Sequence, residues 1–122
     1  MDRNRELGAE GETRAARLLE ASGYRVLARN ARIERVEIDL VAVRADTIAF
    51  VEVKTRRGRA HGAPEEAVDW RKRKRLVRGA VGWLREAGVR AGRVRFDVVV
   101  CELDAAGAWH LRHLEGAFDA GG

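Results

Sequence analysis

Four charged residues lie within two short segments that otherwise consist of strand-forming residues. Glu37 and Asp39 stand in VEIDLVAV, and Glu52 and Lys54 stand in TIAFVEVKT. Carboxylate oxygens are the ligands that Mg²⁺ and Mn²⁺ prefer in proteins. A lysine beside them can orient a water molecule or stabilise the negative charge that develops on a phosphate. This chemistry requires a fold that brings the four side chains together.

A hairpin between the two segments would place acids opposite each other. Alternate residues of a strand share a face, so Glu37 and Asp39 point to the same side, as do Glu52 and Lys54. A two-residue or a four-residue loop between the segments pairs Asp39 with Glu52 and Glu37 with Lys54. A three-residue loop would shift this register, so the pairing is an inference from the loop length.

Asp39 and Glu52 would repel each other in this hairpin, and partial burial would make both charges more costly. A divalent cation between them removes the conflict, and a set of oxygen ligands suits Mg²⁺ or Mn²⁺ better than Zn²⁺. The alternative is a set of ion pairs on an exposed sheet face, each worth about 0–1 kcal/mol. Ion pairs explain Glu37 with Lys54 but not Asp39 facing Glu52, so we favour the metal site.

The remaining segments supply the elements that hold these strands. Helical spacing of apolar residues predicts one helix over residues 5–22 and a second from Pro64 to about Ala87. Apolar runs rich in strand-forming residues predict five strands, over residues 24–33, 36–44, 47–55, 94–103 and 108–114. The order α-βββ-α-ββ indicates one α/β domain over residues 1–122, a sandwich with a central mixed sheet flanked by helices. Residues 117–122 are expected to form a loose tail.

Composition narrows the class of protein further. The chain has 122 residues, which is the size of one domain, and Cys101 is its only cysteine. Neither a disulfide within one chain nor a cysteine zinc site is therefore expected. The charged first residues do not resemble a signal peptide, and no apolar run approaches the roughly 18 residues of a membrane span. We expect a cytoplasmic protein with no membrane segment.

Basic residues are concentrated in two runs, KTRRGR at 54–59 and RKRKR at 71–75, in a chain of net charge +5. Nucleic acid is the commonest partner of such clusters. A solvated helix face and a charged loop are the alternative explanation. Trp70 precedes the second run, where it can either stack on a base or pack against the sheet.

Motifs along most of the chain resemble those of one protein family. In order they are GAEGETRAARLLEASGYRVLARNARI, EIDLVA, FVEVKTR, AVDWRKRKRL with AVGWL, and RFDVV. Together they resemble the YraN family of small bacterial proteins over about residues 8–100. Asp39 with Glu52-Val53-Lys54 also resembles the PD-(D/E)xK nuclease motif. The family is similar to archaeal Holliday junction resolvases and is expected to have the restriction-endonuclease-like fold.

This resemblance implies a metal-dependent DNA endonuclease that hydrolyses phosphodiester bonds, with branched or single-stranded DNA among the candidate substrates. It assigns metal ligation to Glu12, Asp39 and Glu52 and makes Lys54 the catalytic lysine, with Mg²⁺ or Mn²⁺ as cofactor. A homodimer is one expected state, because enzymes similar to resolvases often pair. One departure is Val36, which stands where the family usually has glycine and so changes the backbone next to the acids.

Further residues receive supporting roles from the same resemblance. Glu37 corresponds to the acid of a GEIDL motif and is expected near the metal, and Lys72 corresponds to a helix lysine that can reach a phosphate. Contacts with nucleic acid are expected from the first strand and from the basic runs: Asn30, Arg32, Arg56, Arg57, Arg59, Arg71, Lys72, Arg73, Lys74 and Arg75.

Two functions of other classes remain open. The chain can be a nucleic-acid-binding protein that keeps the nuclease fold without cutting, or an interaction module whose basic runs only solvate its surface. A zinc site built on His61, His110 and His113 is not expected, because the last two face opposite sides of a strand. Asp97 is expected to have a structural hydrogen-bonding role.

Overall fold

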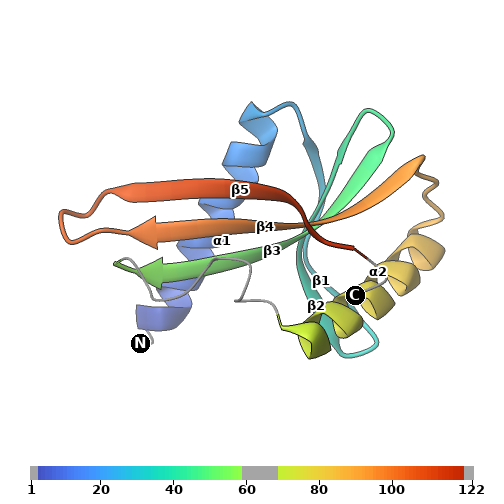
Figure 1. Cartoon of the computed structure of the whole chain (residues 1–122), viewed down its shortest axis with the longest axis horizontal. Helices are drawn as coiled ribbons and strands as arrows, with labels where there is room; N and C mark the ends of the chain where they lie inside the picture. Colours follow the sequence, from blue (N-terminus) through green and yellow to red (C-terminus); the bar gives the residue numbers. More distant parts are fainter. Residues whose placement is uncertain (1–2, 59–68, 120–122) are drawn as a thin grey trace.

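Two helices pack against opposite faces of a five-stranded sheet in the computed structural model, which describes residues 3–58 and 69–119 (Figure 1). The helices are α1 (Arg3–Ala21) and α2 (Trp70–Ala87). The strands are β1 (Arg25–Ile33), β2 (Val36–Arg44), β3 (Thr47–Arg57), β4 (Arg93–Leu103) and β5 (Trp109–Phe118). The predicted order α-βββ-α-ββ is confirmed, and the architecture is consistent with a nuclease-like sandwich.

The strands lie in the order β1-β2-β3-β4-β5, with β3 and β4 parallel and the other neighbours antiparallel. A parallel pair needs a crossover connection, and the chain between β3 and β4 includes α2. The predicted hairpin register is confirmed near its turn, where Arg44 pairs with Thr47 and Leu40 pairs with Val51. No helix among the described residues is both long enough and apolar enough to cross a membrane.

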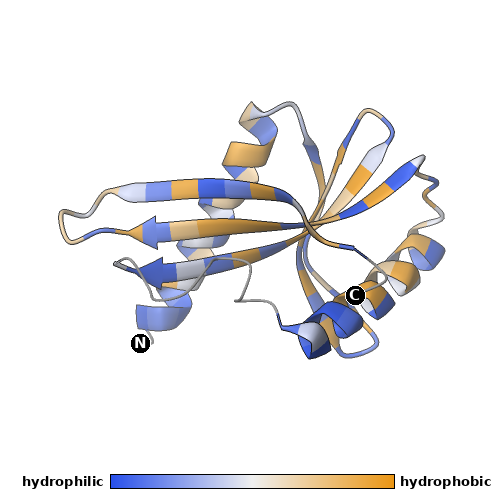
Figure 2. Cartoon of the chain, in the orientation of Figure 1, coloured by the Kyte–Doolittle hydropathy of each residue, from blue (hydrophilic) through white to orange (hydrophobic). Residues whose placement is uncertain are grey.

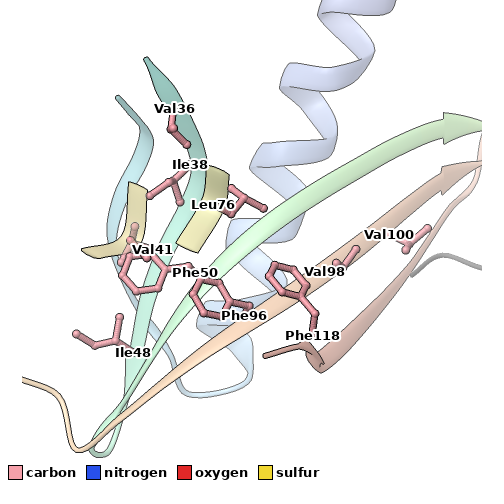
Figure 3. Packing of buried hydrophobic residues seen from close by; sticks show 11 residues of the cluster. Val36, Ile38, Val41, Ile48, Phe50, Leu76, Phe96, Val98, Val100 and Phe118 are labelled. Carbon is pink, nitrogen blue, oxygen red and sulfur yellow. The ribbon is translucent and has the colours of Figure 1, made fainter. Parts of the chain in front are cut away.

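The core consists of two clusters, one on each face of the sheet. Alternation divides β4 between them, so Val98 belongs to the cluster under α2 and Val99 to the cluster under α1. Under α2, Phe96 stacks between Phe50 and Phe118, at centroid distances of 5.9 and 5.0 Å (Figure 3). Strand β5 alternates between apolar and polar residues, whereas β4 is apolar over much of its length, and the first turns of α2 are strongly hydrophilic (Figure 2).

Two predicted boundaries differ from the structure. Helix α2 begins at Trp70, because the Asp69 carboxylate accepts the Lys72 N–H at 2.9 Å and caps the helix there; Pro64 lies outside the described residues. Residues 117–122 were expected to be loose, but Phe118 ends β5 and is only 8% exposed. The prediction of a loose tail was wrong at Phe118, because this aromatic side chain packs into the core under α2. Residues 120–122 lie outside the described part.

Candidate metal centre

The candidate site lies where β2 and β3 stop pairing. The ladder between them ends at Leu40 and Val51, and the next β3 amide of the series, that of Val53, donates to Asp39 Oδ2 at 2.8 Å. A side chain therefore satisfies a backbone donor that a continuous ladder would have paired. The strands open into a fork, and the predicted pairs beyond Leu40 are not part of the ladder.

Strand β2 also twists at this point. Ile38 belongs to the core cluster under α2, whereas Leu40, two residues later, belongs to the cluster under α1. In a regular strand these two side chains would share a face. The alternation fails here because the strand is not regular around Asp39. The irregularity places Asp39 at the fork.

Helix α1 brings Glu12 to the fork through a close contact at Gly11. A Cβ atom on Gly11 would overlap the Thr55 hydroxyl and lie 2.9 Å from Thr55 Cγ2, so only glycine permits this approach to β3. Cys101 Sγ also donates to the Gly11 carbonyl oxygen, at 3.4 Å. Asn30, which has a left-handed backbone (φ 50°), hydrogen-bonds to the Glu12 side chain. Asn30 was expected to contact nucleic acid, and in the structure its side chain is a hydrogen-bond partner of Glu12.

Three carboxylates converge at the fork. Each of Glu12, Glu37 and Asp39 offers one oxygen, and these oxygens lie within 4.8 Å of one another. Among the described residues, Glu12 Oε1 is the one buried side-chain oxygen or nitrogen that has no hydrogen-bond partner. A buried polar atom without a partner destabilises the folded protein by about 1–3 kcal/mol, and a bound ligand would remove this cost. We call these three residues the acid cluster.

Burial and nearby negative charge raise the pKa of two of these acids, Asp39 and Glu12. Burial raises the pKa of Asp39 to about 8, and the charge of Glu52 adds to this increase, while the Val53 N–H opposes it. Burial also raises the pKa of Glu12, which feels the charges of Glu37 and Glu52. A bound cation would favour the ionised form of these groups, and their protons would pass to solvent, because the cation offsets the repulsion between the carboxylates.

Glu52 lies beside the acid cluster, and its cationic partner comes from α2. Its carboxylate is buried and pairs with Lys72 Nζ, which α2 brings over the fork. Glu37 forms its ion pair with Arg32 at 3.9 Å, and not with Lys54. Lys54 is exposed, and no ion pair within 4.0 Å involves it in the part of the chain that the structure describes. The assignment of Glu52 as a metal ligand stays a prediction.

A hollow of about 270 Å³ opens over the fork between β2, β3 and α2. Acids form one part of its wall and cations form another. Its lining residues are Arg35, Val36, Glu37, Asp39, Glu52, Lys72, Arg75 and Leu76. Arg35 was not predicted, although its place two residues before Glu37 was a usable signal. A phosphate group entering the hollow would meet carboxylates able to hold a cation and basic side chains able to balance its charge.

The predicted nucleic-acid contacts are divided between several surfaces. Arg56 pairs with Glu102 at 3.1 Å, and both side chains are largely buried, so this arginine holds β3 to β4. Arg57 lines a separate hollow beside Trp109. Arg73 lies over the Phe118 ring at 5.3 Å. Arg71, Lys74 and Arg75 are exposed on α2, while Arg59 lies outside the described residues.

Asp97 has the structural position that its sequence context predicted. It is fully buried in β4, where it accepts two hydrogen bonds from Arg95, one from the Gly116 N–H and contacts His113 Nε2 at 2.7 Å. Arg95 also reaches the Tyr24 hydroxyl. The network joins β4 to β5 at the irregularity in their pairing. Asp97 therefore supports the sheet and stands apart from the acid cluster.

Comparison with known proteins places the site within a family of similar chains. The family model described as "Uncharacterised protein family UPF0102" matches residues 11–101, which include the whole acid cluster. A UPF0102 protein of Rhodococcus jostii is 44% identical over 118 residues, covering 97% of this chain and 100% of its own length. A UPF0102 protein of Symbiobacterium thermophilum is 46% identical over 117 residues, covering 96% and 99%. A UPF0102 protein of Moorella thermoacetica is 48% identical over 100 residues, covering 82% and 83%.

Proposed function

The chain belongs to the uncharacterised protein family UPF0102, the YraN family that its motifs resemble, and we propose that it is a metal-dependent endonuclease acting on DNA. The observation that carries the proposal is the acid cluster. Glu12, Glu37 and Asp39 converge within 4.8 Å, and one buried Glu12 oxygen has no partner among the described residues. DNA binding alone does not require three carboxylates that repel one another at the fork of the sheet.

The donor set fits a hard divalent cation. All three ligands are carboxylate oxygens, which suit Mg²⁺ or Mn²⁺ better than Zn²⁺. When bound, such a cation polarises a phosphoryl oxygen and lowers the pKa of a bound water. Glu12, Glu37 and Asp39 would hold it, and Glu52 is close enough to Asp39 to join them or to hold a proton between the two carboxyls.

Two lysines compete for the cationic role in this proposal. Lys54 corresponds to the lysine of the nuclease motif, but its side chain is exposed. Lys72 lines the hollow and already contacts Glu52, so it is the better placed of the two to balance charge on a phosphate. We assign this role to Lys72 and leave the orientation of the attacking water to Lys54 or Glu52.

The outward face of α2 is proposed to hold the DNA backbone. Its exposed residues over the first turns are Trp70, Arg71, Lys74, Arg75 and Arg78. Arg75 also lines the hollow, so the basic face is continuous with the acid cluster. A backbone lying along this face would bring one phosphate to the fork, beside the acid cluster that would hold the cation and beside Lys72, which would balance the charge of the phosphate.

A cleavage panel tests the proposal directly. Linear duplex, single strand, flap and four-way junction are incubated with the wild-type protein, with Mn²⁺ or with EDTA. We expect a product that requires Mn²⁺ and disappears in Asp39→Asn and Glu12→Gln. Glu10→Gln is the matched control, because Glu10 lies on the exposed side of the same helix and pairs with Arg14. Binding without product on every substrate would support the non-catalytic alternative, and no binding at low salt would support an interaction module.

A further inference from the structure

We propose that Trp70 is a stacking platform for an unpaired base, and therefore that the protein acts on DNA carrying unpaired nucleotides beside the phosphate held at the fork. This inference rests on the proposed function, because it takes DNA as the partner of the outward face of α2. It adds the substrate class, which the acid cluster does not specify.

The exposure of Trp70 separates it from the other tryptophans. Its side chain is 60% exposed, and it is the one aromatic among the large hydrophobic residues that are exposed in the described part. Trp83 packs edge-on against Phe50 at 5.9 Å and belongs to the core under α2. Trp109 is partly buried beneath Arg14, at 5.0 Å. The alternative that Trp70 packs against the sheet is therefore wrong.

Cations surround the Trp70 ring. The Arg71 guanidinium carbon lies 5.5 Å from the ring centroid, and Lys74 Nζ lies 5.1 Å from it. Aromatic rings flanked by basic side chains are the usual means of binding single-stranded nucleic acid, since bases stack on the ring while cations contact the backbone. An apolar protein partner would instead have to bury these charges at a cost.

Helix geometry connects this platform to the fork. Trp70 opens α2, and Lys72, two residues later, contacts Glu52. Two residues advance a helix by about 3 Å but turn it by about 200°, so Trp70 and Lys72 project from different sides of the same turn. The exposed Arg71 and Arg75 lie between them around the helix, and Arg75 lines the hollow, so a strand that follows these arginines joins the ring to the fork. A base can reach the ring face only when it is free of its neighbours in the duplex stack. A nucleotide close to the bound phosphate must therefore be unpaired.

Tryptophan fluorescence and affinity measurements test the inference. An oligo(dT) single strand and a blunt-ended duplex of two complementary strands with the same number of phosphates are titrated in EDTA, so that no cleavage occurs. We expect the single strand to quench the emission of the wild type and to lose this effect in Trp70→Phe. Trp70→Ala should weaken single-strand binding by about 5- to 150-fold while changing duplex affinity by less than about twofold. Trp109→Phe is the control and should keep the difference between the two DNAs.

Three outcomes separate this inference from the proposed function. Equal quenching by both DNAs, or equal weakening of both by Trp70→Ala, would overturn the platform while leaving DNA binding intact. If Trp70 emission is quenched as the protein concentration rises in the absence of DNA, Trp70 contacts another copy of the chain. This result would also overturn the platform. Failure of the wild type to bind either DNA at low salt would instead overturn the proposed function.

Discussion

The Asp39 carboxylate accepts the Val53 backbone N–H at 2.8 Å, immediately beyond the last pair of the β2–β3 ladder. One side chain thereby has two tasks. It closes the end of the ladder, which stabilises the fold, and it supplies an oxygen to the acid cluster, which costs stability through burial and repulsion. Substitutions at Asp39 can separate the two tasks.

Asp39→Asn should stabilise the metal-free protein and abolish its response to Mn²⁺. The amide oxygen can still accept the Val53 N–H, whereas the buried charge and its repulsion by Glu52 are removed. We expect a gain of at least about 1 kcal/mol near pH 8, or roughly 4 °C in Tm. Asp39→Ala, which also loses the acceptor, should be less stable than Asp39→Asn. Thermal unfolding with and without Mn²⁺ measures both effects. A lower Tm for Asp39→Asn without metal would contradict the conclusion that the buried Asp39 charge destabilises the metal-free protein.

The metal-free protein should lose stability as the pH rises from about 4 to about 8. Asp39 has its pKa raised from an ordinary value of 3.8 to about 8, so the folded state binds more protons than the unfolded state across this range. The contribution is therefore present at low pH and lost as Asp39 ionises. Mn²⁺ should offset the loss, so the increase in Tm that it produces should grow with pH. Urea unfolding at several pH values, with Asp39→Asn as reference, measures this slope. Identical slopes in the two proteins would exclude Asp39 as its source.

Lys72→Met should reduce cleavage by about 10²- to 10³-fold, the usual cost of removing one group that stabilises transition-state charge. The same change should tighten Mn²⁺ binding, because Glu52 loses the cation that now contacts it. Single-turnover rates and calorimetric titration with Mn²⁺ give the two readouts. Arg85→Met, at the exposed last turn of α2, is the control. If Lys54→Met slows cleavage while Lys72→Met does not, the motif lysine acts alone and our assignment fails.

Gly11→Ala should destabilise the protein by about 1–3 kcal/mol and weaken Mn²⁺ binding. The added Cβ would collide with the Thr55 side chain, so α1 must move away from β3 and carry Glu12 with it. Gly8→Ala is a close control, because a Cβ there has nothing within 4 Å. It should stabilise α1 by up to about 1 kcal/mol. Chemical unfolding and Mn²⁺ titration of both variants test this. Unchanged metal affinity in Gly11→Ala would show that Glu12 is not a ligand.

The β2–β3 hairpin shows how far prediction from sequence could reach. The alternation of apolar residues and the short turn predicted the register from Arg44 with Thr47 to Leu40 with Val51, which the structure confirms. Both signals are local, and a one-residue shift would have moved every side chain of one strand to the other face of the sheet. The end of the ladder was not predictable, because Asp39 competes with the backbone for the Val53 amide through its side chain.

The amino-acid sequence alone identified the chemical groups, the elements that carry them and the family, since helix and strand periods and motif order are properties of neighbouring residues. Which groups meet depended on contacts between distant segments. Glu12 reaches Glu37 and Asp39 because Gly11 lets α1 approach Thr55, and Lys72 reaches Glu52 because α2 packs across the open fork. Such contacts arise from the packing of whole elements, which no local pattern encodes.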